Sequence, residues 1–154
     1  MTINELSSLF NPSITKVSAK PEDLMRLSMP AWTTNGFWAM ATKIEPEFVK
    51  KQRDLKTPED TTNLHKGLQN LLAGWEKAKN NELEIKNNFR LAGDFPCVML
   101  KNGRHVAWVN VYFLSLFSKT LCSGGLRFYQ EGKDKPIFVS VGGLVAGLVM
   151  PIKM

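Results

Sequence analysis

The sequence has few of the residues on which metal and thiol chemistry depend. Its 154 residues include two histidines and two cysteines. Cys97 and Cys122 lie far apart and neither belongs to a Cys-x-x-Cys motif. We therefore expect two reduced thiols in a cytoplasmic protein rather than a disulfide. The first six residues lack a basic region followed by an apolar run, so we also expect no secretion signal.

Long apolar runs and catalytic motifs are also missing. No stretch approaches the roughly 18–20 consecutive apolar residues of a membrane span. The sequence contains no Gly-x-Ser-x-Gly elbow, phosphate loop, His-Glu-x-x-His motif or dinucleotide fingerprint. His65 and His105 have no metal-ligand motif beside them, and ordinary helix and hairpin positions explain both. We predict a protein that is not an enzyme and needs no cofactor.

The composition predicts one globular domain over residues 1–154, with residues 1–20 as a polar N-terminal extension. The formal net charge is +6, and residues 97–154 hold seven Lys or Arg against two Asp or Glu. This imbalance suits attraction to a polyanion, and it equally suits basic turns on a globular protein. The candidate nucleic-acid-binding residues are Lys101, Arg104, Lys119, Arg127, Lys133 and Lys135.

The first half of the chain predicts helices and one strand. Pro and acidic residues open a short helix near residues 21–27, and Asn35-Gly36 is a turn that leads into a strand. Residues 45–56 are expected to form a loop or a frayed helix. Leucines at helical spacing predict a long amphipathic helix over residues 57–86, with Thr57 as its cap.

The second half predicts a sheet with one helix. Residues 97–100 and 105–109 form a hairpin about an Asn-Gly turn, and Asn110 caps a helix over residues 110–121. Short strands then follow, separated by glycine-containing turns, at residues 126–130, 136–141 and 145–150. The predicted fold class is α+β, with an antiparallel sheet and its helices packed on one face.

Aromatic side chains next to basic residues indicate a second way to bind nucleic acid. Trp32 and Trp38 flank the Asn35-Gly36 turn, and Trp108 lies where the hairpin meets the helix. Such residues stack on the bases of single strands, although in a small mixed domain they more often form the core. Alternation along a strand favours Trp32 or Trp38 as the one that points outward.

Three segments resemble bacterial DNA sliding clamps, the ring-shaped β subunits of the replicative polymerase. The sequence VNVYFLSLF at residues 109–117 resembles the Asn-x-x-Tyr-Leu-x-x-x-Leu helix start of clamp domains. Residues 125–154 are similar to their closing strands and end in Met-Pro-Ile-Lys-Met, and residues 34–39 resemble an earlier clamp strand. The resemblance covers about the last third of the chain. It implies a clamp-like half-unit at residues 97–154, encoded by a phage or mobile element.

The resemblance implies two kinds of contact. In the family, helices face DNA within a ring of about six domains, so one such chain would need a large homo-oligomer. The polar face of helix 110–121 offers only Lys119, which argues against a ring built from this chain alone. The terminal strand of a clamp also lines a groove for short motifs of replication proteins, and Met150, Pro151 and Ile152 match it. The alternative is a buried last strand.

Three hypotheses follow for function. The leading one is a non-catalytic protein associated with DNA replication that contacts DNA, replication proteins or both, with no membrane partner. The first alternative is a phage-encoded inhibitor that binds a host replication or defence protein. The second is a single-stranded nucleic-acid binder. Met150, Pro151, Ile152, Trp32 and Trp38 are the candidate partner-binding residues.

Overall fold

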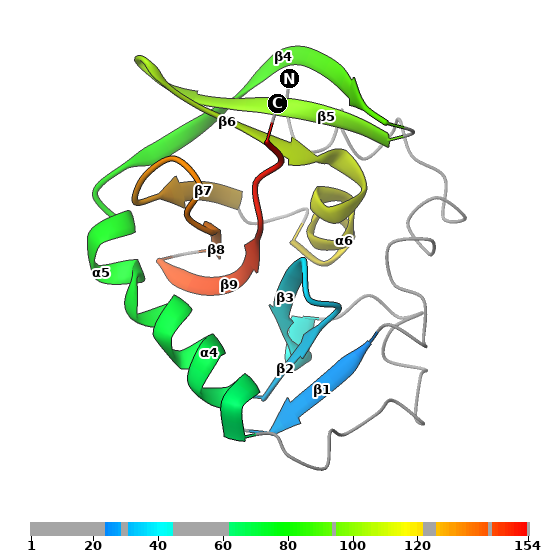
Figure 1. The fold of residues 1–154 in the computed structure, drawn as a ribbon, viewed down its shortest axis with the longest axis vertical. Helices are drawn as coiled ribbons and strands as arrows, with labels where there is room; N and C mark the ends of the chain where they lie inside the picture. Colours follow the sequence, from blue (N-terminus) through cyan, green and yellow to red (C-terminus); the bar gives the residue numbers. More distant parts are fainter. Residues whose placement is uncertain are drawn as a thin grey trace.

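The computed structural model describes residues 24–28, 31–44, 62–93, 95–121, 126–141 and 143–153. The predictions for residues 1–20 and 45–56, and for the start of the long helix, lie outside these ranges. The elements, shown in Figure 1, are β1 (Met25–Ser28), β2 (Ala31–Thr34), β3 (Trp38–Ala41), η2 (Thr42–Ile44), α4 (Thr62–Ala73), α5 (Trp75–Ala78), β4 (Glu82–Ala92), β5 (Phe95–Asn102), β6 (His105–Asn110), α6 (Val111–Leu121), β7 (Leu126–Gln130), β8 (Ile137–Val141) and β9 (Leu144–Val149).

The strands form one antiparallel arrangement in the order β1-β2-β3-β9-β8-β7-β4-β5-β6. The predicted α+β class with an antiparallel sheet is therefore confirmed. Strand β4 belongs to two parts of the sheet, because Leu83 pairs with Phe128 of β7 while most of β4 pairs with β5. The β4–β5 register shifts between Ile85 and Phe89. Figure 1 shows the long, bent β4 carrying β5 and β6 across the top of the molecule.

The C-terminal tail connects the middle of this strand order with its β6 end. After β9, the amide of Met150 donates to the carbonyl of Phe37, and the amide of Ile152 donates to the carbonyl of Trp108 on β6 at 2.7 Å. Strand β6 stands at the end of the strand order and β9 in its middle. The tail therefore closes strands β9-β8-β7-β4-β5-β6 into a barrel-like loop.

Helices cover both faces of the β3-β9-β8-β7 region, so the prediction that they pack on one face is wrong. Helix α6 contributes Leu114 and Phe117 to a core cluster that also contains Ile137 and Val139 of β8. Phe138, which points to the other face of β8, packs with residues of α4 and α5 in a second cluster. The alternation along β8 thus fills two cores, because apolar side chains stand on both faces of the strand.

The first predicted helix is wrong. Residues near 21–27 were expected to be helical, but Met25–Ser28 form β1 and pair with β2 in the register Leu27↔Trp32. Leu24 and Leu27 are buried. Pairing with a neighbouring strand and burial of these leucines outweigh the local helix-start pattern, since propensity is a weak guide where tertiary contacts exist.

The long helix is confirmed only in part. Helix α4 and the short α5 end at Ala78, whereas the prediction ran to residue 86. The chain turns at Asn80 and Asn81 and enters β4, where exposed Glu82, buried Leu83 and exposed Glu84 alternate as in a half-buried strand. The spacing of the leucines alone did not distinguish the helical period of α4 and α5 from the alternating period of β4.

Strong local signals gave correct elements. The hairpin of β5 and β6, helix α6 and the last three strands all occur within a few residues of their predicted bounds. Asn110 acts as a cap, since its Oδ1 accepts the amide of Tyr112 at 2.9 Å. At the Asn35-Gly36 turn, Asn35 Oδ1 accepts the amide of Trp38 at 3.0 Å, and Gly36 has a φ of 95°.

Candidate functional site

Two basic turns that are distant in sequence lie at the same end of the molecule. The β5–β6 turn follows Lys101 and contains Arg104, and the β7–β8 turn contains Lys133 and Lys135. A chain of hydrogen bonds joins their bases. Asn102 Nδ2 donates to Asn81 Oδ1 at 2.8 Å. The side chain of Asn81 in turn donates to the carbonyl of Gln130, also at 2.8 Å.

Gln130 fixes the two turns relative to each other. Its side chain is fully buried. Its Nε2 donates to the carbonyl of Lys135 at 2.8 Å, and its Oε1 lies 2.5 Å from Nε2 of His105. Because a glutamine Oε1 accepts only, Nε2 of His105 is the protonated nitrogen in this contact. One buried amide therefore connects the start of β6 with the end of the β7–β8 turn.

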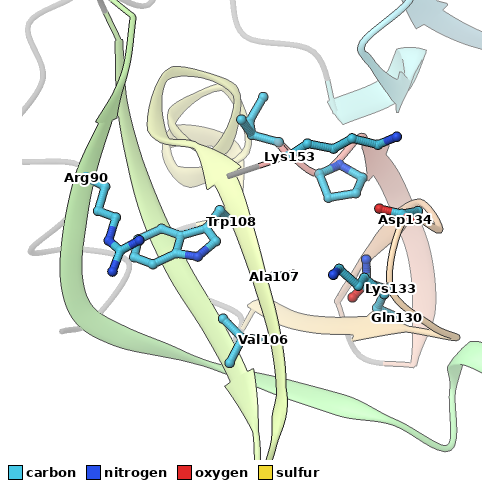
Figure 2. Close-up of a pocket in the computed structure, with 10 residues that line it drawn as sticks. Arg90, Val106, Ala107, Trp108, Gln130, Lys133, Asp134 and Lys153 are labelled. Carbon is cyan, nitrogen blue, oxygen red and sulfur yellow. The ribbon is translucent and has the colours of Figure 1, made fainter.

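A cavity of about 450 Å³ opens beside the second of these turns (Figure 2). It lies between β4, β6, the β7–β8 turn and the C-terminal tail. Its lining residues are Arg90, Val106, Ala107, Trp108, Gln130, Lys133, Asp134, Pro151, Ile152 and Lys153. We call this cavity the Trp108 pocket.

The Trp108 pocket has two walls of different chemistry. On one side the guanidinium of Arg90 lies over the indole of Trp108, 5.0 Å from the ring centroid. This is a cation–π geometry, worth about 0.5–1 kcal/mol at an exposed site. Figure 2 shows Lys133, Asp134 and Lys153 on the other side of strand β6 from the indole. The charged lining residues are thus three cations and one acid.

The predicted basic residues are only partly brought together. Lys133 lines the Trp108 pocket, and Lys101, Arg104 and Lys135 belong to the two adjoining turns. Arg127 lies on β7, and its guanidinium lies 3.6 Å from the carboxylate of Glu82. The side chain of Lys119 lies outside what the structure describes.

The predicted partner-binding set divides in two. Pro151 and Ile152 line the Trp108 pocket. Met150 instead lines an apolar groove of about 240 Å³ between β1–β3, β9 and α4. Phe37 and Leu71, also in the lining, are 62% and 40% exposed. The last residues of the chain therefore contribute to two different surfaces, and not to the single groove that the resemblance implied.

Trp32 and Trp38 are buried, so the prediction that one of them points outward is wrong. They are 7% and 2% exposed. The two side chains do belong to different core clusters, as alternation requires. Both faces of this part of the sheet are covered, and a base has no exposed tryptophan to stack on there. Trp108 is half-buried and lines the Trp108 pocket.

Arg90 and Gln130 were not singled out from the sequence, and Lys153 was noted only as part of the Met-Pro-Ile-Lys-Met terminus. Arg90 lies outside the basic C-terminal part of the sequence. The alternating pattern of β4 is the signal that would have placed Arg90 on a strand. Nothing local marks Gln130, because its role comes from contacts with His105 and Lys135.

Two titratable groups among the residues that the structure describes have clearly shifted pKa values. Burial raises the pKa of the Cys97 thiol, which keeps it protonated and inert near neutral pH. A hydrogen bond from Lys86 lowers the pKa of Glu84, an ordinary surface ion pair with 2.8 Å between its atoms. Within the described ranges, no three His, Cys, Asp or Glu side chains gather as metal ligands do.

None of the helices described here is both long and apolar enough to cross a membrane. Comparisons of the chain with protein-family models, with curated proteins and with solved structures find no match. The resemblance to sliding clamps therefore stays a prediction made from the sequence.

Proposed function

We propose that this protein is a non-catalytic DNA-binding protein, whose contact surface is the end of the molecule that carries the two basic turns. The observation that supports this most is the hydrogen-bonded junction at Gln130, which holds Lys133 and Lys135 beside the turn of Lys101 and Arg104. Clustered cations neutralise phosphates and release counterions, which provides most of the affinity in non-specific binding. DNA, and a role in its replication, are what the resemblance to sliding clamps adds.

The two turns carry enough cations to contact several phosphates of a nucleic acid. Four cations lie in or next to the turns, and Arg90 and Lys153 extend them into the Trp108 pocket. Glu131 and Asp134 are the acids of the β7–β8 turn. Glu131 Oε1 lies 3.9 Å from Nζ of Lys77. Four neutralised phosphates would give a salt slope of about −3 to −4 in log K against log salt.

Salt-dependent binding of labelled DNA tests the proposal. The double substitution Lys133→Glu and Lys135→Glu should weaken binding at least tenfold at low salt. It should also make the slope of log K against log salt less steep, by the amount expected for the loss of about two phosphate contacts. Lys43→Glu with Lys66→Glu is the matched control. It changes the net charge equally at exposed positions on η2 and α4. Equal losses in the two double variants would show attraction by net charge alone and contradict the assigned surface.

Binding of a partner protein is a second candidate function, supported by the apolar groove. Its lining is apolar apart from Thr34, whose hydroxyl donates to the carbonyl of Trp38. A Cβ added at Gly36 or Gly67 meets no atom within 4 Å, so the rim of the groove is open. An apolar peptide segment of a replication protein, as the resemblance implies, would cover the exposed ring of Phe37.

A labelled peptide with the clamp-binding motif of a bacterial replicative polymerase tests this candidate. Phe37→Glu should abolish binding, because it places a charge at the apolar rim. Leu91→Glu is the matched control, since Leu91 is 74% exposed on β4 and does not line the groove. A peptide that fails to bind the unaltered protein, or that binds the Phe37→Glu protein as well, removes the candidate. Native mass spectrometry of the same sample measures the oligomeric state, since a monomer excludes a ring.

A further inference from the structure

We infer that the Trp108 pocket binds one unpaired nucleotide, whose base packs on the Arg90–Trp108 wall while its phosphate pairs with Lys133 and Lys153. This inference rests on the proposed function and makes it specific: the bound nucleic acid is single-stranded at this site. The ligand is a nucleotide, which is either free or part of a single strand.

The size and shape of the pocket fit a single nucleotide. Its volume of about 450 Å³ falls in the range of roughly 300–1,000 Å³ that holds small organic ligands. A base inside a duplex has both faces stacked on its neighbours and its polar edge paired, so it cannot reach a wall inside a pocket of this size. An unstacked base presents a free π-face to aromatic and guanidinium groups.

The arrangement of charge fits a ligand with one flat end and one anionic end. The Arg90–Trp108 wall is planar and polarisable, with 5.0 Å between the guanidinium carbon and the ring centroid. The ammonium groups of Lys133 and Lys153 come from separate segments on the other side (Figure 2). The lining also contains Val106, Ala107, Pro151 and Ile152, which offer apolar contact. Among the described residues of the lining, Asp134 is the one acid against three cations, which leaves an excess of two positive charges.

Backbone contacts keep the two walls in place. Arg90 stands on β4 in register with Cys97 of β5, and Met99 of β5 pairs with Trp108 of β6. The tail that carries Lys153 is joined to Trp108 by the hydrogen bond from Ile152. The pocket therefore exists before a ligand arrives, and binding spends little free energy on ordering the backbone.

Anisotropy of a labelled oligothymidylate, compared with a duplex of equal length, tests the inference. Trp108→Ala should weaken oligothymidylate binding roughly 5- to 150-fold, as expected for the loss of one stacked base. Duplex binding by the basic turns should change less than about twofold. Lys153→Glu, at an exposed position, should also weaken oligothymidylate binding at least fivefold, and it tests the pocket without altering the sheet. Lys66→Glu on α4 is the matched charge control.

Competition identifies the chemistry and the source of the ligand. Thymidine monophosphate should displace the oligothymidylate where equal inorganic phosphate does not. It should also change the tryptophan fluorescence of the unaltered protein more than that of the Trp108→Ala protein, and an equal response of the two proteins would overturn the pocket. Equal losses of single-strand and duplex binding in the Trp108→Ala and Lys153→Glu proteins would also overturn the pocket while the proposed function stands. If the unaltered protein binds neither DNA, the proposed function itself fails, and the pocket inference falls with it.

Discussion

The close approach of α6 to β9 makes Gly147 a sensitive position in the core. A Cβ added there would overlap the ring of Phe117 and would lie 2.7 Å from the carbonyl oxygen of Ala39 on β3. Phe117 is fully buried, so its ring cannot turn outward into solvent. Gly147→Ala must therefore displace either α6 or the paired strands β3 and β9.

The expected cost is the balance of two terms. Overpacking a filled core costs about 1–3 kcal/mol, and removing a glycine from the unfolded chain returns about 0.4–1 kcal/mol. We expect Gly147→Ala to lower the free energy of unfolding by about 1–2 kcal/mol. For a chain of this length, that lowers the melting temperature by roughly 2–8 °C. The urea midpoint falls by about 0.5–1 M if the slope stays near 2 kcal/mol/M.

Urea denaturation followed by circular dichroism measures this change, with another glycine as the control. Gly67 lies within α4, is exposed, and a Cβ there meets nothing within 4 Å. Gly67→Ala should therefore raise stability by about 0.5–1 kcal/mol. Phe117→Leu combined with Gly147→Ala should cost less than the sum of the two single changes, because the smaller side chain removes part of the overlap. Stability of the Gly147→Ala protein within about 0.5 kcal/mol of the original would refute the reasoning.

Three further predictions concern the tail, the junction of the turns and the buried thiol. Ile152→Pro removes the donor to Trp108 and should cost about 1 kcal/mol in urea denaturation, whereas Ile152→Val should cost less. Gln130→Leu leaves His105 and the carbonyl of Lys135 without their partner and should lower stability by about 1–3 kcal/mol and weaken duplex binding. Gln130→Glu keeps an acceptor for His105 but loses the donor to Lys135 and buries a carboxylate, so it should not restore stability. Because burial raises the pKa of Cys97, the unfolded thiol ionises first as pH rises, so stability should fall above about pH 8.5. In the Cys97→Ala protein this part of the alkaline loss should be absent, and an unchanged alkaline profile would contradict it.

Elements with strong local signals were predictable from the sequence. The Asn-Gly turn of the β5–β6 hairpin requires a positive φ, and Gly103 has a φ of 57°. Asn110 begins α6 because its side chain satisfies a free backbone amide at the start of the helix. Strands β7, β8 and β9 are apolar and bounded by turn residues. In each case the deciding interactions lie within a few residues.

Elements that depend on distant partners were not predictable in this way. Met25–Ser28 became a strand because β2 provides its hydrogen bonds, although its sequence resembled the start of a helix. Strand β4 begins where Leu83 meets Phe128, a contact that no local pattern encodes. The burial of both Trp32 and Trp38 required helices on both faces of the sheet.

The sequence by itself determined the α+β class, the basic character of the C-terminal part, and the residues from which a binding surface can be built. Only the tertiary structure decided which of those residues meet. Arg90, Trp108, Lys133 and Lys153 come from four separate segments, and the bend of β4 and the hydrogen bond of Ile152 bring them around one pocket. Charge and aromaticity are properties of single residues, whereas a pocket depends on strand order and register, which are set by packing across the whole chain.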